Sequence, residues 1–115
     1  MKGRLGQSDA EFYALENSTT PTHVGSLVIL GRPDEGLEYE RLLATIEERL
    51  AEVPRYRQKV RTVPLGIARP VWVEDRDFDI TYHVRVSALP QPGSDDQLHD
   101  LVARLNSRPL DRERP

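Results

Sequence analysis

The chain has 115 residues, a formal net charge of −3 and no cysteine, so it has room for one domain and cannot form disulfides or thiolate metal sites. The small acidic excess argues against a nucleic-acid-binding protein. The longest apolar-rich run, residues 24–30, is far shorter than the ~20 residues of a membrane-spanning helix. Because no apolar stretch follows the charged N-terminus, we expect a cytoplasmic protein whose contacts with membranes are peripheral.

A short helix is predicted near the N-terminus. Ser8 and Glu11 have the spacing of a capping box, in which each side chain accepts a hydrogen bond from a backbone amide. Phe12 and Leu15 lie three positions apart and would share one face of this helix. The turn-forming residues 17–21 are expected to end it.

Residues 24–30 predict a strand that is covered on both sides, because both of its alternating faces are mostly apolar. His23 leads into this strand, where its imidazole could touch a substrate or orient a loop. A hydrogen-bonded structural histidine is the alternative that we favour. Residues 31–36 include two glycines, a proline and an aspartate and therefore predict a turn.

The clearest periodicity in the chain predicts an amphipathic helix over residues 37–53. Apolar residues recur there at intervals of three and four, and acidic residues occupy the opposite face. Pro54 is expected to end the helix at the preceding residue. The apolar positions are Tyr39, Leu42, Leu43, Ile46, Leu50 and Val53.

The next segment carries a basic residue at every second position, the period of an exposed strand. Residues 71–73 are β-prone and are predicted to pair back with it as a hairpin, with Trp72 in the core. This basic row could contact the phosphates of a cofactor, a nucleic acid or an anionic lipid. We favour the alternative that it is a solvated face opposite the acidic residues 74–79. The basic row consists of Arg55, Arg57, Lys59 and Arg61.

Two more elements are predicted before the C-terminus. Apolar and polar residues alternate over residues 80–86, which indicates a half-buried strand. Ser94 and Gln97 form a second possible capping box, ahead of a helix that ends near Asn106. The order of predicted helices and strands indicates an α/β fold.

No residue pattern identifies a catalytic or cofactor site. The histidines at positions 23, 83 and 99 have no metal-ligand spacing, and neither a nucleophile elbow nor a nucleotide-binding loop is present. We therefore expect no metal and no cofactor. Asp9 is ambiguous, because a carboxylate in the first turn of a helix is stabilised by the helix dipole without any further role.

Several short segments of the sequence, taken in their order and spacing, resemble the bacterial wax ester synthase/diacylglycerol acyltransferase family over nearly the whole chain. Each segment alone is short, whereas their order and spacing together are specific. They are Ser8-Asp9-Ala10-Glu11-Phe12, Thr20-Pro21-Thr22-His23-Val24-Gly25, Val53-Pro54-Arg55-Tyr56-Arg57-Gln58, Arg69-Pro70-Val71-Trp72-Val73, Phe78-Asp79-Ile80 with Tyr82-His83-Val84, and Ser107-Arg108-Pro109-Leu110-Asp111.

This resemblance implies the fold of chloramphenicol acetyltransferase and of condensation domains, with a mixed sheet, packed helices and a tunnel between two halves. It also implies a general base in an H-H-x-x-x-D-G motif, which this sequence lacks. Residues 1–115 would then be the N-terminal portion of the domain, truncated before that motif and inactive alone. His23 and Asp9 are the residues that we expect to line the tunnel.

The implied reaction transfers a fatty acyl group from acyl-CoA, a substrate rather than a cofactor, to diacylglycerol or a long-chain alcohol. The expected location is cytoplasmic, peripheral to the inner membrane face or to lipid droplets, and no nucleic acid is expected as a partner. A different class remains open, because the basic row is also compatible with a non-catalytic module that binds a lipid surface or a partner chain.

Overall fold

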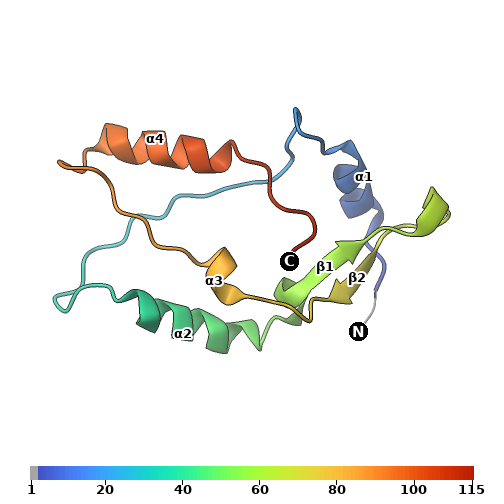
Figure 1. Cartoon of the computed structure of the whole chain (residues 1–115), viewed down its shortest axis with the longest axis horizontal. Helices are drawn as coiled ribbons and strands as arrows, with labels where there is room; N and C mark the ends of the chain where they lie inside the picture. The colour runs from blue at the N-terminus through green and yellow to red at the C-terminus, as the bar shows by residue number, and fades with distance from the viewer. Residues whose placement is uncertain (1–2) are drawn as a thin grey trace.

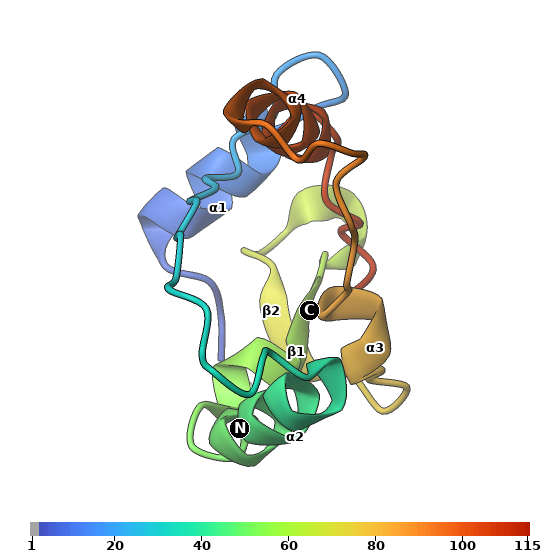
Figure 2. The same cartoon turned by 90° about the vertical axis from the view of Figure 1, so that its left-hand side faces the viewer.

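Two long helices lie at opposite sides of the molecule in the computed structural model, which describes residues 3–115 (Figures 1 and 2). They are α2 (Tyr39–Leu50) and α4 (Asp95–Asn106). A small sheet and α1 (Gln7–Leu15) occupy one end of the longest axis. The remaining two residues, at the charged N-terminus noted above, lie outside the described part. No helix within residues 3–115 is long and apolar enough to cross a bilayer.

The helix α1 forms as predicted, but not with the predicted cap. The helix begins at Gln7, where Ala10 N donates to Gly6 O, and Gly6 supplies no capping side chain. Ser8 therefore lies inside the first turn, and Glu11 Oε1 accepts instead from Gln7 Nε2 at 3.1 Å. The capping box predicted at Ser8 is wrong, because the helix begins two positions too early for it, with Gly6 rather than Ser8 at the N-cap.

The predicted strand over residues 24–30 does not form. The segment is extended, but its side chains are largely exposed, with Val24 96% and Ile29 76% accessible. Figure 1 shows it running as an irregular chain below α4, and Figure 2 shows it on the side of the molecule opposite α3 (Ile80–His83). A strand needs a neighbour that pairs with its backbone, and residues 3–115 place none beside this one.

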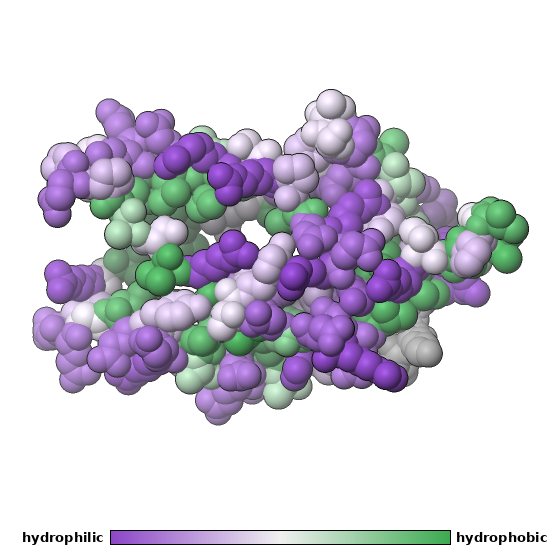
Figure 3. All heavy atoms as spheres, in the orientation of Figure 1, coloured by the Kyte–Doolittle hydropathy of each residue, from purple (hydrophilic) through white to green (hydrophobic). Residues whose placement is uncertain are grey.

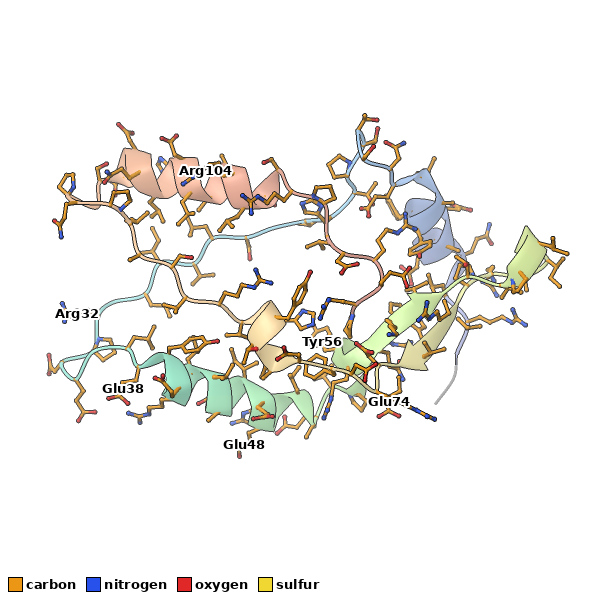
Figure 4. The ribbon with its side chains drawn as sticks, in the orientation of Figure 1. Arg32, Glu38, Glu48, Tyr56, Glu74 and Arg104 are labelled. Carbon is orange, nitrogen blue, oxygen red and sulfur yellow. The ribbon has the colours of Figure 1, made fainter. Side chains whose placement is uncertain are left out.

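The amphipathic helix α2 and the following chain reversal agree with the sequence pattern. The turn before α2 closes through a hydrogen bond from Gly36 N to Pro33 O, and Glu48 projects from the outer side of the helix (Figure 4). The helix ends at Leu50, three residues before the predicted end at Val53, and Pro54 opens the short 3-10 helix η1 (Pro54–Arg57). The residues Arg55 and Arg57, predicted within a strand, belong to η1.

The structure confirms the hairpin. Its two strands make up the only sheet within residues 3–115. The strands β1 (Gln58–Arg61) and β2 (Val71–Glu74) pair antiparallel, with Val60 opposite Trp72, and η2 (Pro64–Gly66) lies in the loop between them. The predicted mixed sheet is therefore not present within residues 3–115. The coarser expectation of an α/β fold holds.

The N-terminal residues 3–5 continue this small layer along the other side of β2. Leu5 N donates to Pro70 O at 2.9 Å, and Trp72 N donates to Gly3 O at 2.8 Å. As a result Leu5 is only 2% exposed, the single buried hydrophobic residue among those described. Trp72 itself is half-buried rather than in a closed core.

The predicted strand at 80–86 does not form: the helix α3 occupies its first half, and residues 84–86 belong to no strand of the described residues. Asp79 caps α3, because its carboxylate accepts from Thr81 N at 3.0 Å and from Thr81 Oγ1 at 2.7 Å. These local hydrogen bonds stabilise the start of a helix, and the helix forms in place of the strand that the alternating pattern predicted. The second capping box is confirmed, with Ser94 and Gln97 bonding each other's backbone amides at the start of α4.

A shielded ion pair holds the hairpin together. Lys59 Nζ donates to Asp75 Oδ1 at 2.8 Å, and the two side chains are 16% and 6% exposed. This hydrogen bond, with a smaller contribution from the Asp77 backbone amide, lowers the pKa of the Asp75 carboxyl below its ordinary value. The basic row therefore faces the acidic segment at this position, as the structural alternative predicted.

We expect Asp75→Asn to weaken the hairpin by about 2 kcal/mol, because a charged hydrogen bond is lost and Lys59 stays shielded. Hydrogen exchange of the β1 and β2 amides should accelerate about 30-fold, whereas the exposed neighbour Glu74→Gln should change little. A carboxyl with a lowered folded pKa stabilises above its unfolded pKa and loses that effect as pH falls through the folded value. Acid should therefore reduce protection below about pH 4, and unchanged protection in Asp75→Asn would contradict this assignment.

Candidate functional site

An apolar groove lies between residues 23–27 and the C-terminal half of α4. Its volume is about 450 Å³, and Val102, Leu105 and Leu110 line its far wall. Figure 3 shows apolar side chains gathered along the inner side of α4, facing a hollow in the molecule. The groove is open rather than enclosed, and Val24 and Leu27 on its wall remain exposed.

His23, predicted to line a substrate tunnel, lies at this groove and is also a hydrogen-bonded histidine. Its Nε2 lies 2.7 Å from Asn106 O at the end of α4. Because a carbonyl oxygen only accepts, the ring must donate through Nε2, which leaves Nδ1 as the acceptor in the neutral ring. Nδ1 is shielded from solvent and has no hydrogen-bond partner among the described residues.

Polar contacts from α1 and the C-terminal segment fix the chain just before His23. Glu16 Oε2 accepts from Thr22 N at 2.9 Å and from Thr22 Oγ1 at 2.8 Å. These bonds lower the pKa of the Glu16 carboxyl, with smaller contributions from the charges of Arg112 and His23. Arg112 in turn donates to Tyr13 O at 2.7 Å and lies 3.5 Å over the Tyr13 ring.

Asp9, the other predicted tunnel residue, is not part of this arrangement. It is exposed in the first turn of α1 and is absent from the groove that His23 lines. The structure therefore does not bring Asp9 and His23 to the same wall. A role of Asp9 at a substrate site stays a prediction.

A second apolar groove, of about 410 Å³, lies between α2, α3 and the hairpin. Ile46 and Leu50 come from α2, and Phe78 stacks on His83 with ring centroids 5.4 Å apart. Burial, followed by the charge of Arg114, lowers the pKa of His83. The sequence predicted a strand at His83 and did not indicate this groove, although the helical apolar stripe of α2 was a signal for it.

Each cation of the basic row has a partner within the protein. Arg55 lies 4.6 Å over the Trp72 ring and Arg57 lies 5.0 Å over the Phe78 ring. Arg61 Nη1 donates to Glu113 Oε2 at 2.9 Å, and Lys59 is paired as described above. The observed contacts thus account for the row structurally. No group of three or more histidine, aspartate or glutamate residues within residues 3–115 has the arrangement of a metal site.

The comparisons with known proteins give a consistent result. The wax ester synthase/diacylglycerol acyltransferase catalytic domain matches residues 5–115. A Mycobacterium tuberculosis protein named probable diacylglycerol O-acyltransferase tgs3 is 67% identical over the whole chain, which spans 42% of that relative. The relatives named tgs1 and tgs2 from the same species are 40% and 41% identical, over 80% and 94% of the chain and 19% and 24% of their own lengths. No solved structure gives a significant match.

The family match covers all of the described elements from Leu5 onward, including the His23 groove and the hairpin. This match agrees with the resemblance that the short sequence segments indicated. The chain spans less than half of the length of each of these relatives. The chain belongs to the wax ester synthase/diacylglycerol acyltransferase family.

Proposed function

We propose that the chain forms the N-terminal portion of an acyltransferase domain that moves a fatty acyl group from acyl-CoA to diacylglycerol or a long-chain alcohol. The observation that carries this proposal is the match of the catalytic domain to residues 5–115. The names of the three mycobacterial relatives, all diacylglycerol O-acyltransferases, support diacylglycerol as the acceptor. We also propose the two-halved fold of chloramphenicol acetyltransferase for the whole domain.

In this reaction the acceptor oxygen attacks the thioester carbonyl carbon, the carbon–sulfur bond breaks, and CoA leaves as a thiol. A general base must take the hydroxyl proton and must lie within hydrogen-bond reach of it. The family's paired histidines are absent from this sequence. We therefore assign to residues 3–115 the binding of apolar chains and the positioning of substrate, with the His23 groove as one wall of the tunnel.

The groove supports this assignment through its chemistry. Its walls come from apolar side chains of residues 24–27 and of α4, which suits a fatty chain, and His23 contributes a polar edge. Because diacylglycerol and wax alcohols are poorly soluble in water, we propose that the whole enzyme works peripherally at the inner membrane face or at lipid droplets. Acyl-CoA and the acceptor are its proposed partners.

A chimera with the tgs3 relative tests the proposed function. Residues 1–115 would replace the matching segment of that relative, which is 67% identical. With radiolabelled palmitoyl-CoA and diolein we expect triacylglycerol at a rate within tenfold of the relative's own. A soluble, folded chimera that makes neither triacylglycerol nor wax ester, beside an active relative, would contradict the proposal.

In the same chimera we expect His23→Ala to lower acyl transfer about tenfold, whereas His99→Ala on the exposed side of α4 should have no effect. The loss follows from breaking the bond to Asn106 O, which is worth about 1 to 1.5 kcal/mol. His23→Gln keeps a donor and should recover part of the activity. Equal activity of the His23→Ala and His99→Ala chimeras would show that His23 has no role in the site.

A further inference from the structure

The loop between β1 and β2 presents two large apolar side chains to solvent. Leu65 is 96% and Ile67 is 79% accessible. Figure 1 shows η2 at one extreme of the longest axis, beyond the two strands, and Figure 3 shows apolar side chains gathered at that extreme. Single exposed apolar residues are common on protein surfaces, whereas here two of them project from one protruding loop. We call residues 63–67 the hairpin tip.

Neither the backbone nor the packing of the hairpin tip explains a leucine at position 65. Gly66 N donates to Val63 O at 3.2 Å and closes a turn, in which Leu65 has a φ of 60° and a ψ of 9°. Turns with a positive φ at this position favour glycine or asparagine, because a larger side chain crowds the backbone. Contacts within the protein do not offset this strain, since the side chain is almost fully exposed. A strained and unpacked apolar residue of this kind indicates a functional role.

The charges next to the hairpin tip are positive. Residues 62–73 contain no acidic residue and one cation, Arg69. Arg4 lies beside it, because Arg4 Nη1 donates to Arg69 O at 3.3 Å. Both arginines are exposed, and neither forms an ion pair within residues 3–115. Two cationic side chains are therefore available beside the apolar tip.

We infer that the hairpin tip inserts into the surface of an anionic lipid bilayer, with Leu65 and Ile67 among the acyl chains. Insertion removes the two aliphatic side chains from water. Arg4 and Arg69 are long enough to reach the lipid phosphate groups at the same time. A protein partner needs a broader surface than one loop, because a specific interface buries about 800 Å² on each side. The inference rests on the peripheral location proposed above and names the element that makes the contact.

Flotation of the tgs3 chimera with lipid vesicles tests the inference without any measurement of activity. Leu65→Gly should weaken vesicle binding about tenfold or more, because no side chain at this position enters the bilayer. Glycine also suits the positive φ, so this variant should unfold at the same temperature as the chimera or at a higher one. Ile67→Gln should weaken binding by a similar factor. Leu37→Gln is the matched control, because Leu37 is 69% exposed but lies just before α2, at the other end of the molecule (Figure 1).

The lipid headgroup tests the contribution of charge. We expect the chimera to bind vesicles that contain phosphatidylglycerol more tightly than vesicles of phosphatidylcholine alone. Arg69→Gln should weaken binding to the anionic vesicles about fivefold and leave binding to the neutral vesicles unchanged. Salt should reduce the same difference between the two kinds of vesicle.

Equal vesicle binding by the chimera and its Leu65→Gly variant, or no binding by the chimera itself, would overturn the inference. An equal loss in Leu37→Gln would also overturn it, because binding would then follow exposed apolar surface in general. A changed oligomeric state of Leu65→Gly with unchanged vesicle binding would assign the tip to a second copy of the chain instead. The proposed function would fail by a different result: no acyl transfer to dioctanoylglycerol, an acceptor that disperses without a bilayer, by a chimera that still binds vesicles.

Discussion

Purified by itself, the 115-residue chain should consume palmitoyl-CoA no faster than buffer does, with either diolein or hexadecanol as acceptor. None of its three histidines is placed as a base against a bound hydroxyl. His23 has Nε2 engaged with Asn106 O and Nδ1 shielded, and His83 stacks on Phe78. His99 lies on the exposed surface of α4. We expect the rate of acyl transfer to be at least 10⁴-fold lower than that of the chimera, because both general-base catalysis and the positioning of the substrates are missing.

The measurement is thin-layer separation of radiolabelled product over several hours, with the chimera as the positive control. Turnover by the chain alone that disappears in His23→Ala would place the base within this chain and would contradict the account. Turnover that survives both His23→Ala and His99→Ala would point to a contaminating enzyme.

The chain alone should also fail to unfold in a single sharp transition. Leu5 is the single buried hydrophobic residue within residues 3–115, whereas Val24, Ile29 and Leu30 are mostly exposed. A core this small supplies little cooperativity, and the exposed apolar surface favours aggregation. We expect strong binding of a hydrophobic dye and a broad thermal transition with little change in heat capacity.

Calorimetry and dye fluorescence, compared between the chain and the tgs3 chimera, test this expectation. The chimera should bind less dye per molecule and unfold over a narrower temperature range. A monomeric chain with one sharp transition, whose calorimetric and van't Hoff enthalpies agree, would instead indicate a self-sufficient module.

The elements that the sequence predicted correctly are those determined by local chemistry. The capping box of Ser94 and Gln97 and the apolar stripe of α2 each act within a few residues, so the pattern is sufficient. The prediction is wrong at Asp79. Its side chain accepts a hydrogen bond from Thr81 N and caps a helix, where the alternation of apolar and polar residues had indicated a strand. The strand predicted at 24–30 does not form, because a strand depends on a neighbour that pairs with its backbone and not only on the segment's own composition.

The candidate site was predictable only in part for a similar reason. His23 was chosen for its place before an apolar run, and it does lie at a groove. Its partner Asn106 is 83 positions away in the sequence, so no spacing rule relates the two. Asp9 was chosen because it lies in the first turn of a predicted helix. The helix dipole stabilises a carboxylate there, so this position does not indicate that the side chain lies near a cavity.

If this chain forms the N-terminal portion of an acyltransferase domain, it should restore acyl transfer to the rest of the domain of a relative that lacks its own N-terminal segment. The part of the tgs3 relative that follows the matched segment would be purified and mixed with increasing amounts of the 115-residue chain, with palmitoyl-CoA and diolein present. We predict that triacylglycerol synthesis, absent from either polypeptide alone, rises with the concentration of the chain and then saturates. Synthesis that stays at background at every concentration, with the two polypeptides shown to be associated, would contradict the claim.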